Sequence, residues 1–319
     1  MFMSFVDVVG AGRIGHGIAL CVAMHGFRVR LRDVKHRTSD ERKMLREKIL
    51  SQIQESLRLF EECEFIHEPV DEVVKRIVFA DGYDGLEDAF HVVEAVPEDA
   101  AVKKQVYSMV CERIGSDALL ASTSSSMRPS SLAKHVKHPE RFLVTHWINP
   151  AELIPLVEVA PAPQTSRETV EEAVEFLRRC GKRPVVCGDS PGYVSARLQA
   201  ALMNEALRLV EEGVASPHDV DEALMAGIGF RLSVHGLLEF VDWGGVDILY
   251  RVDEYLAAEL NAERFRPPAL LRKLVEERRL GMHVGRGVFD YDGIDIEALK
   301  LSRKKAMVKR LKQLRDEQG

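Results

Sequence analysis

One segment, residues 142–159, places two ionisable side chains among aliphatic neighbours. Two apolar stretches flank an Asn149-Pro150 turn, with His146 near the end of the first and Glu158 inside the second. If the two stretches are strands that fold back about Glu152, His146 and Glu158 lie opposite each other on one face. An unpaired carboxylate is expensive to bury, so we expect the two side chains to be partners.

Such a pair suits the oxidation of an alcohol. Hydride transfer from a secondary alcohol needs a base for the hydroxyl proton, and the reverse reduction needs an acid at the same place. A histidine serves both directions because its ordinary pKa is near 6.5. Glu158, bound to the other ring nitrogen, would fix the tautomer of His146 and stabilise its protonated form. The alternative is a purely structural His–Glu pair.

A dinucleotide fingerprint lies near the start of the chain. Gly10-Ala11-Gly12-Arg13-Ile14-Gly15 follows an apolar strand, Phe5–Val9, and leads directly into a helix, Ile14–His25. Glycines Gly10, Gly12 and Gly15 permit a tight turn and let backbone amides approach a pyrophosphate at the positive end of the helix. The motif, with Arg13 and Ile14, therefore predicts a cofactor-binding loop.

The end of the next strand indicates which cofactor binds. Arg28–Arg32 is followed by Asp33, where a carboxylate accepts hydrogen bonds from the ribose hydroxyls of NAD and repels the 2′-phosphate of NADP. Lys35 and Arg37, like Arg32, are cations that would accommodate that phosphate. The sequence favours NAD and leaves NADP as the alternative.

The order of elements predicts an α/β fold, a Rossmann-type doubly wound and mostly parallel sheet followed by an all-helical C-terminal domain. A capping box, Thr38 with Glu41, opens a long helical excursion over about residues 38–64. The remaining expected strands are Ile77–Ala80, His91–Val96, Ala118–Ser122, Phe142–Thr145, Leu153–Val159 and Pro184–Cys187.

Strand signals stop at a Ser190-Pro191-Gly192 turn, which indicates a domain boundary there. We expect residues 1–189 to bind NAD and residues 190–319 to form a helical domain for the substrate cleft and dimerisation. Its expected helices are Tyr193–Glu212, His218–Met225, Val234–Leu260 with breaks at its glycines, Pro268–Arg279 and a charged one over about Ile296–Gln318.

Composition excludes several classes of function. The 319 residues carry a formal net charge of −6 with no large basic region, which disfavours a nucleic-acid partner. We expect no membrane span and no signal peptide, since no apolar run is long enough. Five scattered cysteines without a CxxC pair indicate free thiols in the cytoplasm, and no metal site is predicted.

Together these motifs resemble the 3-hydroxyacyl-CoA dehydrogenase family, to which lambda-crystallin also belongs. The similarity extends over essentially the whole chain. The stretches that carry it are Gly10–Gly15, Val93–Glu98, Ser122–Ser126, His146–Pro150 through Glu158, Pro191-Gly192-Tyr193 with Arg197, and Gly281–Phe289.

The resemblance implies roles for particular residues. His146 would be the catalytic acid/base and Glu158 its orienting partner, with Ser125 at the substrate oxygen and Asn149 of the His-x-x-Asn-Pro motif in the catalytic set. Glu98, Lys103 and Ser122 would bind the cofactor on its nicotinamide side. It also implies a homodimer formed through the helical domain, and a small-molecule substrate from fatty acid metabolism, an L-3-hydroxyacyl-CoA.

Two departures from the family pattern keep other substrates open. Ala196 stands where the family usually has an asparagine that helps to hold the substrate carbonyl. Residues 55–64 are mostly acidic, where CoA-binding members carry basic residues for the CoA phosphates. Alternatives are a dehydrogenase of a free hydroxy acid, a sugar acid or a ring-borne alcohol, and a non-catalytic NAD-binding or crystallin-like structural protein.

Overall fold

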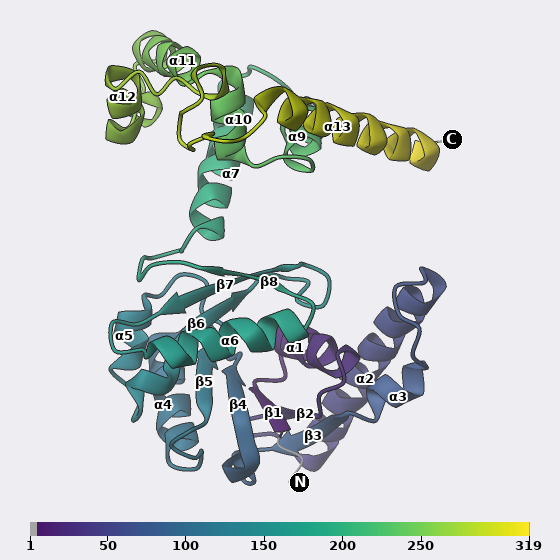
Figure 1. The fold of residues 1–319 in the computed structure, drawn as a ribbon. Helices are drawn as coiled ribbons and strands as arrows, with labels where there is room; N and C mark the ends of the chain where they lie inside the picture. The colour runs from purple at the N-terminus through teal and green to yellow at the C-terminus, as the bar shows by residue number, and fades with distance from the viewer. Residues whose placement is uncertain (1–4, 319) are drawn as a thin grey trace. The chain divides into compact units, whose positions relative to one another are not determined.

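The computed structural model describes residues 5–318 (Figure 1). The chain divides by its internal contacts into two compact units, Met1–Met203 and Asn204–Gly319, and each is described by itself. This division by contacts falls inside helix α7 (Ser195–Glu211). The domain boundary that we expect after residue 189 from the sequence stays a prediction.

The first unit is built on one eight-stranded sheet with the order β3-β2-β1-β4-β5-β6-β7-β8. Strands β1 to β6 are parallel, β7 is antiparallel to β6, and β8 is parallel to β7. The predicted doubly wound, mostly parallel sheet is confirmed. The strands are β1 (Phe5–Val9), β2 (Val29–Asp33), β3 (Ile77–Asp81), β4 (Ala89–Glu94), β5 (Leu119–Ser122), β6 (Phe142–Trp147), β7 (Leu156–Pro161) and β8 (Arg183–Val186).

Helices cover both faces of this sheet. One buried cluster joins the sheet to α1, α2 and α6, and the other joins its opposite face to α4 and α5. The helices of this unit are α1 (Arg13–Met24), α2 (Ser39–Glu62), α3 (Val70–Val74), α4 (Ala100–Cys111), α5 (Pro129–Ala133) and α6 (Arg167–Arg179), with 3₁₀ turns at Leu86–Asp88 and Pro139–Arg141.

The strand order reverses between β1 and β4, which is where open α/β sheets bind ligands. The Ala95 amide donates to the Val9 carbonyl at 2.8 Å, so the two strand ends stay paired up to this point. Beyond it the chain turns through Gly10, whose φ of 123° suits glycine alone. A methyl group at Gly10 would lie 2.5 Å from the Ala95 carbonyl oxygen. The turn therefore needs a glycine for two reasons.

The hairpin of β6 and β7 has the predicted register, with His146 directly opposite Glu158. Three strand bounds are corrected: the first strand ends at Trp147 and not at Thr145, and β7 spans Leu156–Pro161 and not Leu153–Val159. The amides of Leu153 and Ile154 turn back to the Pro150 carbonyl at 3.1 and 2.9 Å. Those residues therefore belong to the loop, not to the ladder.

Helix α2 is the expected long excursion. The side chain of Thr38 accepts a hydrogen bond from the Glu41 amide, and Glu41 accepts one from the Thr38 amide, so the predicted capping box is present. Its buried residues are Ile49, Ile53, Leu57 and Phe60, which recur at helical spacing and join the core on the α1 side.

The second unit is helical, as predicted, and has a small buried core of Val246, Leu271 and Leu274. Gly245, with φ 105°, is the single residue between two of its helices, Leu237–Gly244 and Val246–Glu259. After α7 come α8 (Pro217–Ala223), a π-helical turn (Leu224–Gly229), α9 (Phe230–Leu232), α10 (Leu237–Gly244), α11 (Val246–Glu259), α12 (Ala269–Glu276) and α13 (Ile296–Gln318), with 3₁₀ turns at Glu263–Phe265 and Met282–Val284.

Within residues 5–318 no single helix is long and apolar enough to cross a bilayer. One pair, Pro217–Leu232 with Leu237–Gly244, passes by length and composition together but is bent by 89°.

The imidazole of His91, on β4, is buried against Phe176 with 4.3 Å between the ring centroids. Burial lowers the pKa of His91 to about 3, and the charge of Arg141 lowers it further in the same direction. The folded protein thus keeps this histidine neutral at a pH where the unfolded chain binds a proton. Its contribution to stability is fully present above pH 6.5 and is lost progressively as the pH falls toward 3.

We predict that His91→Phe makes the fold more resistant to acid. Between neutral pH and about pH 4.5 the wild type should lose about 2–3 kcal/mol of unfolding free energy through this residue, and the variant should not lose that part. Urea denaturation at both pH values measures the difference. His218→Phe, a change at an exposed histidine, is the control and should follow the wild type. Equal acid sensitivity of His91→Phe and wild type would contradict the assignment.

Candidate active site

The predicted partners meet in the β6–β7 hairpin. His146 Nδ1 lies 2.8 Å from Glu158 Oε2, with Glu158 fully buried and the His146 side chain 9% exposed. Neighbouring aliphatic residues of both strands close around them. The pair therefore lies in a dry environment, where its electrostatic interaction is strong.

Glu158 has further donors on helix α7. The backbone amides of Val194 and Ser195 donate to Oε1 at 3.0 and 2.7 Å, and the Ser195 hydroxyl donates to Oε2 at 2.6 Å. Burial opposes the charge of Glu158, but the hydrogen bonds from Ser195 and His146 outweigh it and lower its pKa. The positive N-terminal end of α7 stabilises the carboxylate in the same sense.

An ionised carboxylate only accepts hydrogen bonds, so Nδ1 of His146 must carry the proton in this contact. In the neutral ring the other nitrogen, Nε2, is then a free acceptor. His146 is also one of the residues that line the adjoining cleft. The geometry provides a base there that can take up one proton while Glu158 holds the resulting charge.

A serine-rich turn after β5 faces the same cleft. Glu98 Oε1 accepts hydrogen bonds from the Ser124 hydroxyl at 2.6 Å and from the amides of Ser125 and Ser126 at 3.1 and 3.0 Å. Burial would raise the pKa of Glu98, but the bonds from Ser124 and Ser126 lower it overall. Glu98 therefore fixes the turn through its charge and leaves the exposed Ser125 side chain at the cleft.

Beneath this turn lies a buried network around Glu94, the last residue of β4. Lys103 Nζ donates to both Glu94 oxygens at 2.8 and 3.0 Å, the Tyr107 hydroxyl donates at 2.8 Å and the Ser122 hydroxyl at 2.7 Å. Lys103 and Ser122 are almost completely buried, and neither lines the cleft. The structure thus places these two expected cofactor residues below the cleft floor, where they hold β4, α4 and β5 together.

The predicted dinucleotide loop forms the second part of the cleft. Gly10, Gly12, Arg13 and Ile14 line it together with Asp33, while Gly15 is covered by the loop. A methyl group on Gly15 would lie 1.8 Å from the Gly10 carbonyl oxygen, so the loop and α1 can pack this closely only with glycine there. At Gly12, by contrast, nothing lies within 4 Å, and no side chain caps α1. An open helix N-terminus of this kind fits the pyrophosphate of NAD.

Asp33 ends β2 at the far side of this loop. Its carboxylate accepts hydrogen bonds from Arg37 Nε at 2.5 Å and from the Lys35 amide at 3.2 Å. Arg32 points elsewhere, because its guanidinium is buried against Asp7. Of the three cations near Asp33 in sequence, only Lys35 and Arg37 therefore line the cleft with it.

The pocket at His146 and the pocket at the dinucleotide loop are neighbours, because Arg13, Ile14 and Val96 line both. The part next to His146 has a volume of about 340 Å³. It is lined by Glu98, Ser125, His146 and Asn149 from the expected set, and by Ser195, Ala196 and Gln199 of α7. The structure thus places two adjacent pockets between Asp33 and His146, and Ala196 lines the second where the family usually has an asparagine.

Sequence reasoning missed several residues of this site. Ser195 bonds to Glu158, and Gln199 lines the cleft, but both come from the start of a helix whose polar residues look like any solvated face. Glu94 had a signal: it is a carboxylate at the end of an otherwise apolar strand. Its partners Lys103 and Tyr107 come from the following helix, α4, and only packing brings them to it.

Comparison with known proteins agrees with this architecture. Residues 5–190 match the model of the 3-hydroxyacyl-CoA dehydrogenase NAD binding domain, and residues 192–291 match that of the 3-hydroxyacyl-CoA dehydrogenase C-terminal domain. The chain is 34% identical to a probable 3-hydroxybutyryl-CoA dehydrogenase of Deinococcus radiodurans over 284 residues, which cover 89% of this chain and 99% of that protein.

A second relative acts on a different kind of molecule. The 5-formyl-3-hydroxy-2-methylpyridine 4-carboxylate 5-dehydrogenase of Mesorhizobium japonicum is 35% identical over 226 residues, 70% of this chain and 73% of that protein. Among solved structures, a 3-hydroxyacyl-CoA dehydrogenase of Archaeoglobus fulgidus superposes with a TM-score of 0.76 at 31% identity, covering 97% of this chain and 99% of that one.

Both domain models match in the predicted order, and they cover the loop, the sheet and the hairpin described above. The chain belongs to the 3-hydroxyacyl-CoA dehydrogenase family and is an NAD-dependent dehydrogenase.

Proposed function

We propose that this enzyme interconverts an L-3-hydroxyacyl-CoA and its 3-keto form, a reaction of fatty acid metabolism. The observation that carries the proposal is the hydrogen-bonded His146–Glu158 pair at a pocket that adjoins the pocket of the dinucleotide loop. The relatives from Deinococcus radiodurans and Archaeoglobus fulgidus, named for 3-hydroxybutyryl-CoA and 3-hydroxyacyl-CoA, support this class of substrate.

In the proposed mechanism the glycine loop and Asp33 would hold NAD, which would supply the acceptor for the hydride of the carbinol carbon. His146 Nε2 takes the hydroxyl proton in the same step, and it returns that proton in the reverse reaction. Glu158, held ionised by Ser195 and the start of α7, keeps Nδ1 protonated and stabilises the positive ring. Because its carboxylate is already oriented in a dry site, no reorganisation is needed when the charge forms.

The other predicted site residues have supporting roles in this proposal. Ser125 donates its hydroxyl to the reacting oxygen, and Asn149, which lines the same pocket, orients the substrate. Glu98 shapes the serine turn beside the nicotinamide. Lys103 and Ser122 act from below through Glu94, holding the strand ends on which the cofactor rests.

One pair of observations favours a second candidate, a free hydroxy acid or a ring-borne alcohol. Ala196 lines the cleft without a polar group, and the exposed residues Glu55, Glu61 and Glu62 make the end of α2 unsuitable for CoA phosphates. The pyridine carboxylate dehydrogenase of Mesorhizobium japonicum shows that relatives of this chain include enzymes named for such compounds.

We further propose that residues 1–189 bind NAD, that residues 190–319 form the substrate-closing and dimerisation domain, and that the enzyme is a cytoplasmic homodimer. All five cysteines are free, which suits a reducing compartment. The second unit exposes many large apolar side chains relative to its small core, including Leu207, Val214, Met225, Tyr255, Leu270 and Val308. Such surfaces are typical of subunit interfaces.

The substrate is tested by following NADH absorbance with acetoacetyl-CoA, acetoacetate and a formylated pyridine carboxylate. We expect kcat/KM for the thioester to exceed that for acetoacetate by about tenfold or more, since binding energy from the CoA portion contributes to the transition state. Turnover of a free acid or of the pyridine compound with a silent thioester would contradict the first candidate and establish the second.

The acid/base pair is tested with His146→Gln, Glu158→Gln and the double variant. Each single change should lower kcat by about 10²–10⁴-fold with NADH affinity retained, because proton transfer is lost and cofactor contacts are not. The double variant should be no slower than His146→Gln, since the two side chains act as one unit. His138→Gln, at a partly exposed histidine whose Nδ1 lies 3.2 Å from Glu140 Oε1, is the matched control and should leave kcat unchanged. If the double variant lost kcat by the product of the two single losses, the two side chains would act independently and the coupled pair would be ruled out.

The oligomer is tested by light scattering during gel filtration. We expect about twice the chain mass of 35.9 kDa for the wild type, and a shift toward the single-chain mass for Leu207→Glu. Leu207 is 69% exposed on α7, whereas the control Leu59→Glu changes an exposed leucine of α2. A wild type of single-chain mass, or a Leu207→Glu variant as large as wild type, would contradict the proposed interface.

A further inference from the structure

The loop between β6 and β7 is held by one buried cation. Lys182, which immediately precedes β8, donates from Nζ to the carbonyls of Ala151 at 2.6 Å and Ile154 at 2.9 Å, and reaches that of Glu152 at 3.4 Å. An ammonium group has three hydrogens, and here all three have carbonyl acceptors. Within residues 5–318 the acceptors of its ammonium group are backbone carbonyls and no carboxylate forms a salt bridge with it, although Lys182 is only 6% exposed.

A buried ammonium group without a carboxylate is costly, so its retention needs a reason. The carbonyls that it holds belong to a loop outside the sheet ladder, where backbone groups have few partners of their own. The anchor itself is fixed: the Lys182 amide donates to the Leu177 carbonyl at 3.0 Å, and the next amide, of Arg183, donates to Pro155 at 2.7 Å. Lys182 thus ties the loop to the junction of α6 and β8.

The same loop packs on the helix of the dinucleotide site. At Gly17 of α1, a methyl group would lie 2.6 Å from Glu152 Oε2 and 3.3 Å from the Ala151 side chain. Gly17 follows the fingerprint loop by a single turn of helix. The segment that Lys182 holds therefore abuts the element whose N-terminus receives the cofactor.

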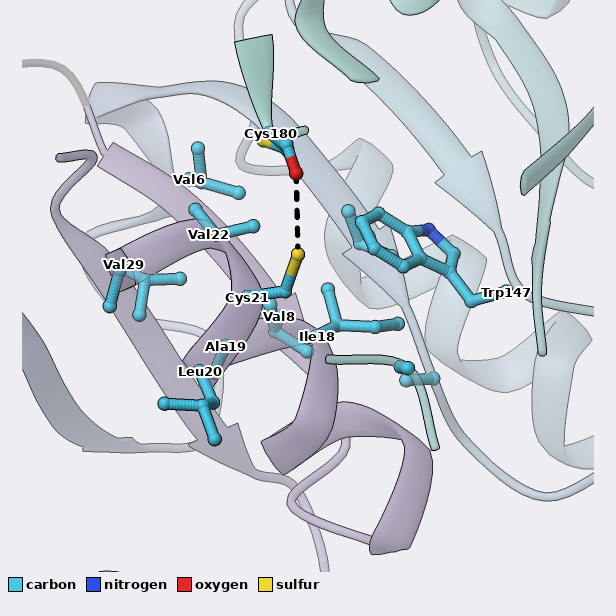
Figure 2. Close-up of a cluster of buried hydrophobic side chains, with 14 of the residues drawn as sticks. Val6, Val8, Ile18, Ala19, Leu20, Cys21, Val22, Val29, Trp147 and Cys180 are labelled. Atoms are coloured by element: carbon cyan, nitrogen blue, oxygen red, sulfur yellow. Dashed lines mark hydrogen bonds between the residues drawn. The ribbon is translucent and has the colours of Figure 1, made fainter. Parts of the chain in front are cut away.

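Lys182 also contacts Trp147, the residue that follows His146 on β6. Lys182 Nζ lies 5.6 Å from the centre of the Trp147 ring, a cation–π contact with an indole that is almost fully buried. Figure 2 shows this indole in the core cluster with Ile18 and Cys21 of α1. Lys182 is thus next to both the catalytic strand and the cofactor helix.

We propose that Lys182 is a positioning residue, which clamps residues 151–154 and so sets the place of His146 relative to the cofactor helix α1. The proposal rests on the proposed acid/base function of His146. Its physical basis is that hydride and proton transfer both depend steeply on geometry, and a displacement of about 1 Å can cost about 100-fold in rate.

The kinetic test compares Lys182→Met with Lys134→Met, the same substitution at an exposed lysine. Methionine keeps most of the length of the lysine side chain and removes its charge. We expect Lys182→Met to lower kcat by about 10–100-fold while KM and the dissociation constant of NADH change less than about threefold. Lys182→Arg, which keeps the charge and several donors in a different shape, should recover part of the loss. A variant with wild-type kcat, or with kcat lost only in proportion to unfolded protein, would overturn the proposal.

A second measurement needs no substrate. In a Trp243→Phe background Trp147 is the remaining tryptophan of two, so its fluorescence reports on this loop alone. Acrylamide should quench Trp147 at least about twofold more strongly in Lys182→Met than in Lys134→Met, because a loosened loop exposes a ring that is 3% exposed in the native fold. Unchanged quenching in Lys182→Met would overturn the clamp even if the kcat of that variant were lowered.

The two readouts separate failure of the clamp from failure of the proposed function. If no compound of the panel is turned over by the wild type, the proposed function fails, and the quenching comparison still decides whether Lys182 holds the loop. If Lys182→Met yields no folded protein, Lys182→Arg is measured in its place. Reduced kcat and raised quenching in Lys182→Arg support the proposal, and wild-type values for both overturn it.

Discussion

The candidate active site depends on the hydrogen bonds that the buried carboxylate of Glu158 accepts. Glu158 lies on β7, contacts His146 on β6 and receives three hydrogen bonds from the start of α7. A charge in a dry interior must be compensated by donors in good geometry, and here the donors come from separate segments of the chain. The requirement to solvate one carboxylate therefore fixes the hairpin, the histidine and the beginning of the long helix together.

Two other carboxylates at the ends of the parallel strands also accept hydrogen bonds from separate segments of the chain. Glu94 gathers Lys103, Tyr107 and Ser122 beneath the cleft, and Glu98 orders the serine turn above it. Beyond the strand ends there are no ladder hydrogen bonds, and the two carboxylates hold the neighbouring segments together there. As a result the loops at this edge are held by charge-assisted bonds, which are stronger and more directional than neutral ones. A rigid edge of this kind is what a reaction that depends on precise distances requires.

The sheet decides where these groups can meet. Parallel strands bring all their carboxyl ends to one edge, and the reversal of strand order between β1 and β4 opens a crevice there for the dinucleotide. The antiparallel strand β7 departs from that pattern. By turning back beside β6 it returns a carboxylate to the same edge, facing the histidine next to the end of the preceding strand.

Local sequence determined a large part of this protein. The strand–glycine loop–helix order, the capping box of α2 and the doubly wound class all follow from short-range patterns, because they depend on backbone freedom, helix termini and hydrophobic periodicity. The opposition of His146 and Glu158 also followed, since residues of one hairpin are related by register alone. The start of β7 was misjudged, because apolar residues Leu153 and Ile154 look like a strand although their amides close a turn.

Only the tertiary structure decided which side chains reach the cleft. Lys103 and Ser122 lie below it, bound to Glu94, while Ser195 and Gln199 join it from a helix far along the chain. The place of Lys182 against the loop of residues 151–154 has no sequence signal at all, since a lysine after a glycine looks like a solvated surface residue. Such placements arise when a buried polar group takes its partners from whichever segment packs beside it, and that choice depends on the whole fold rather than on the neighbouring residues.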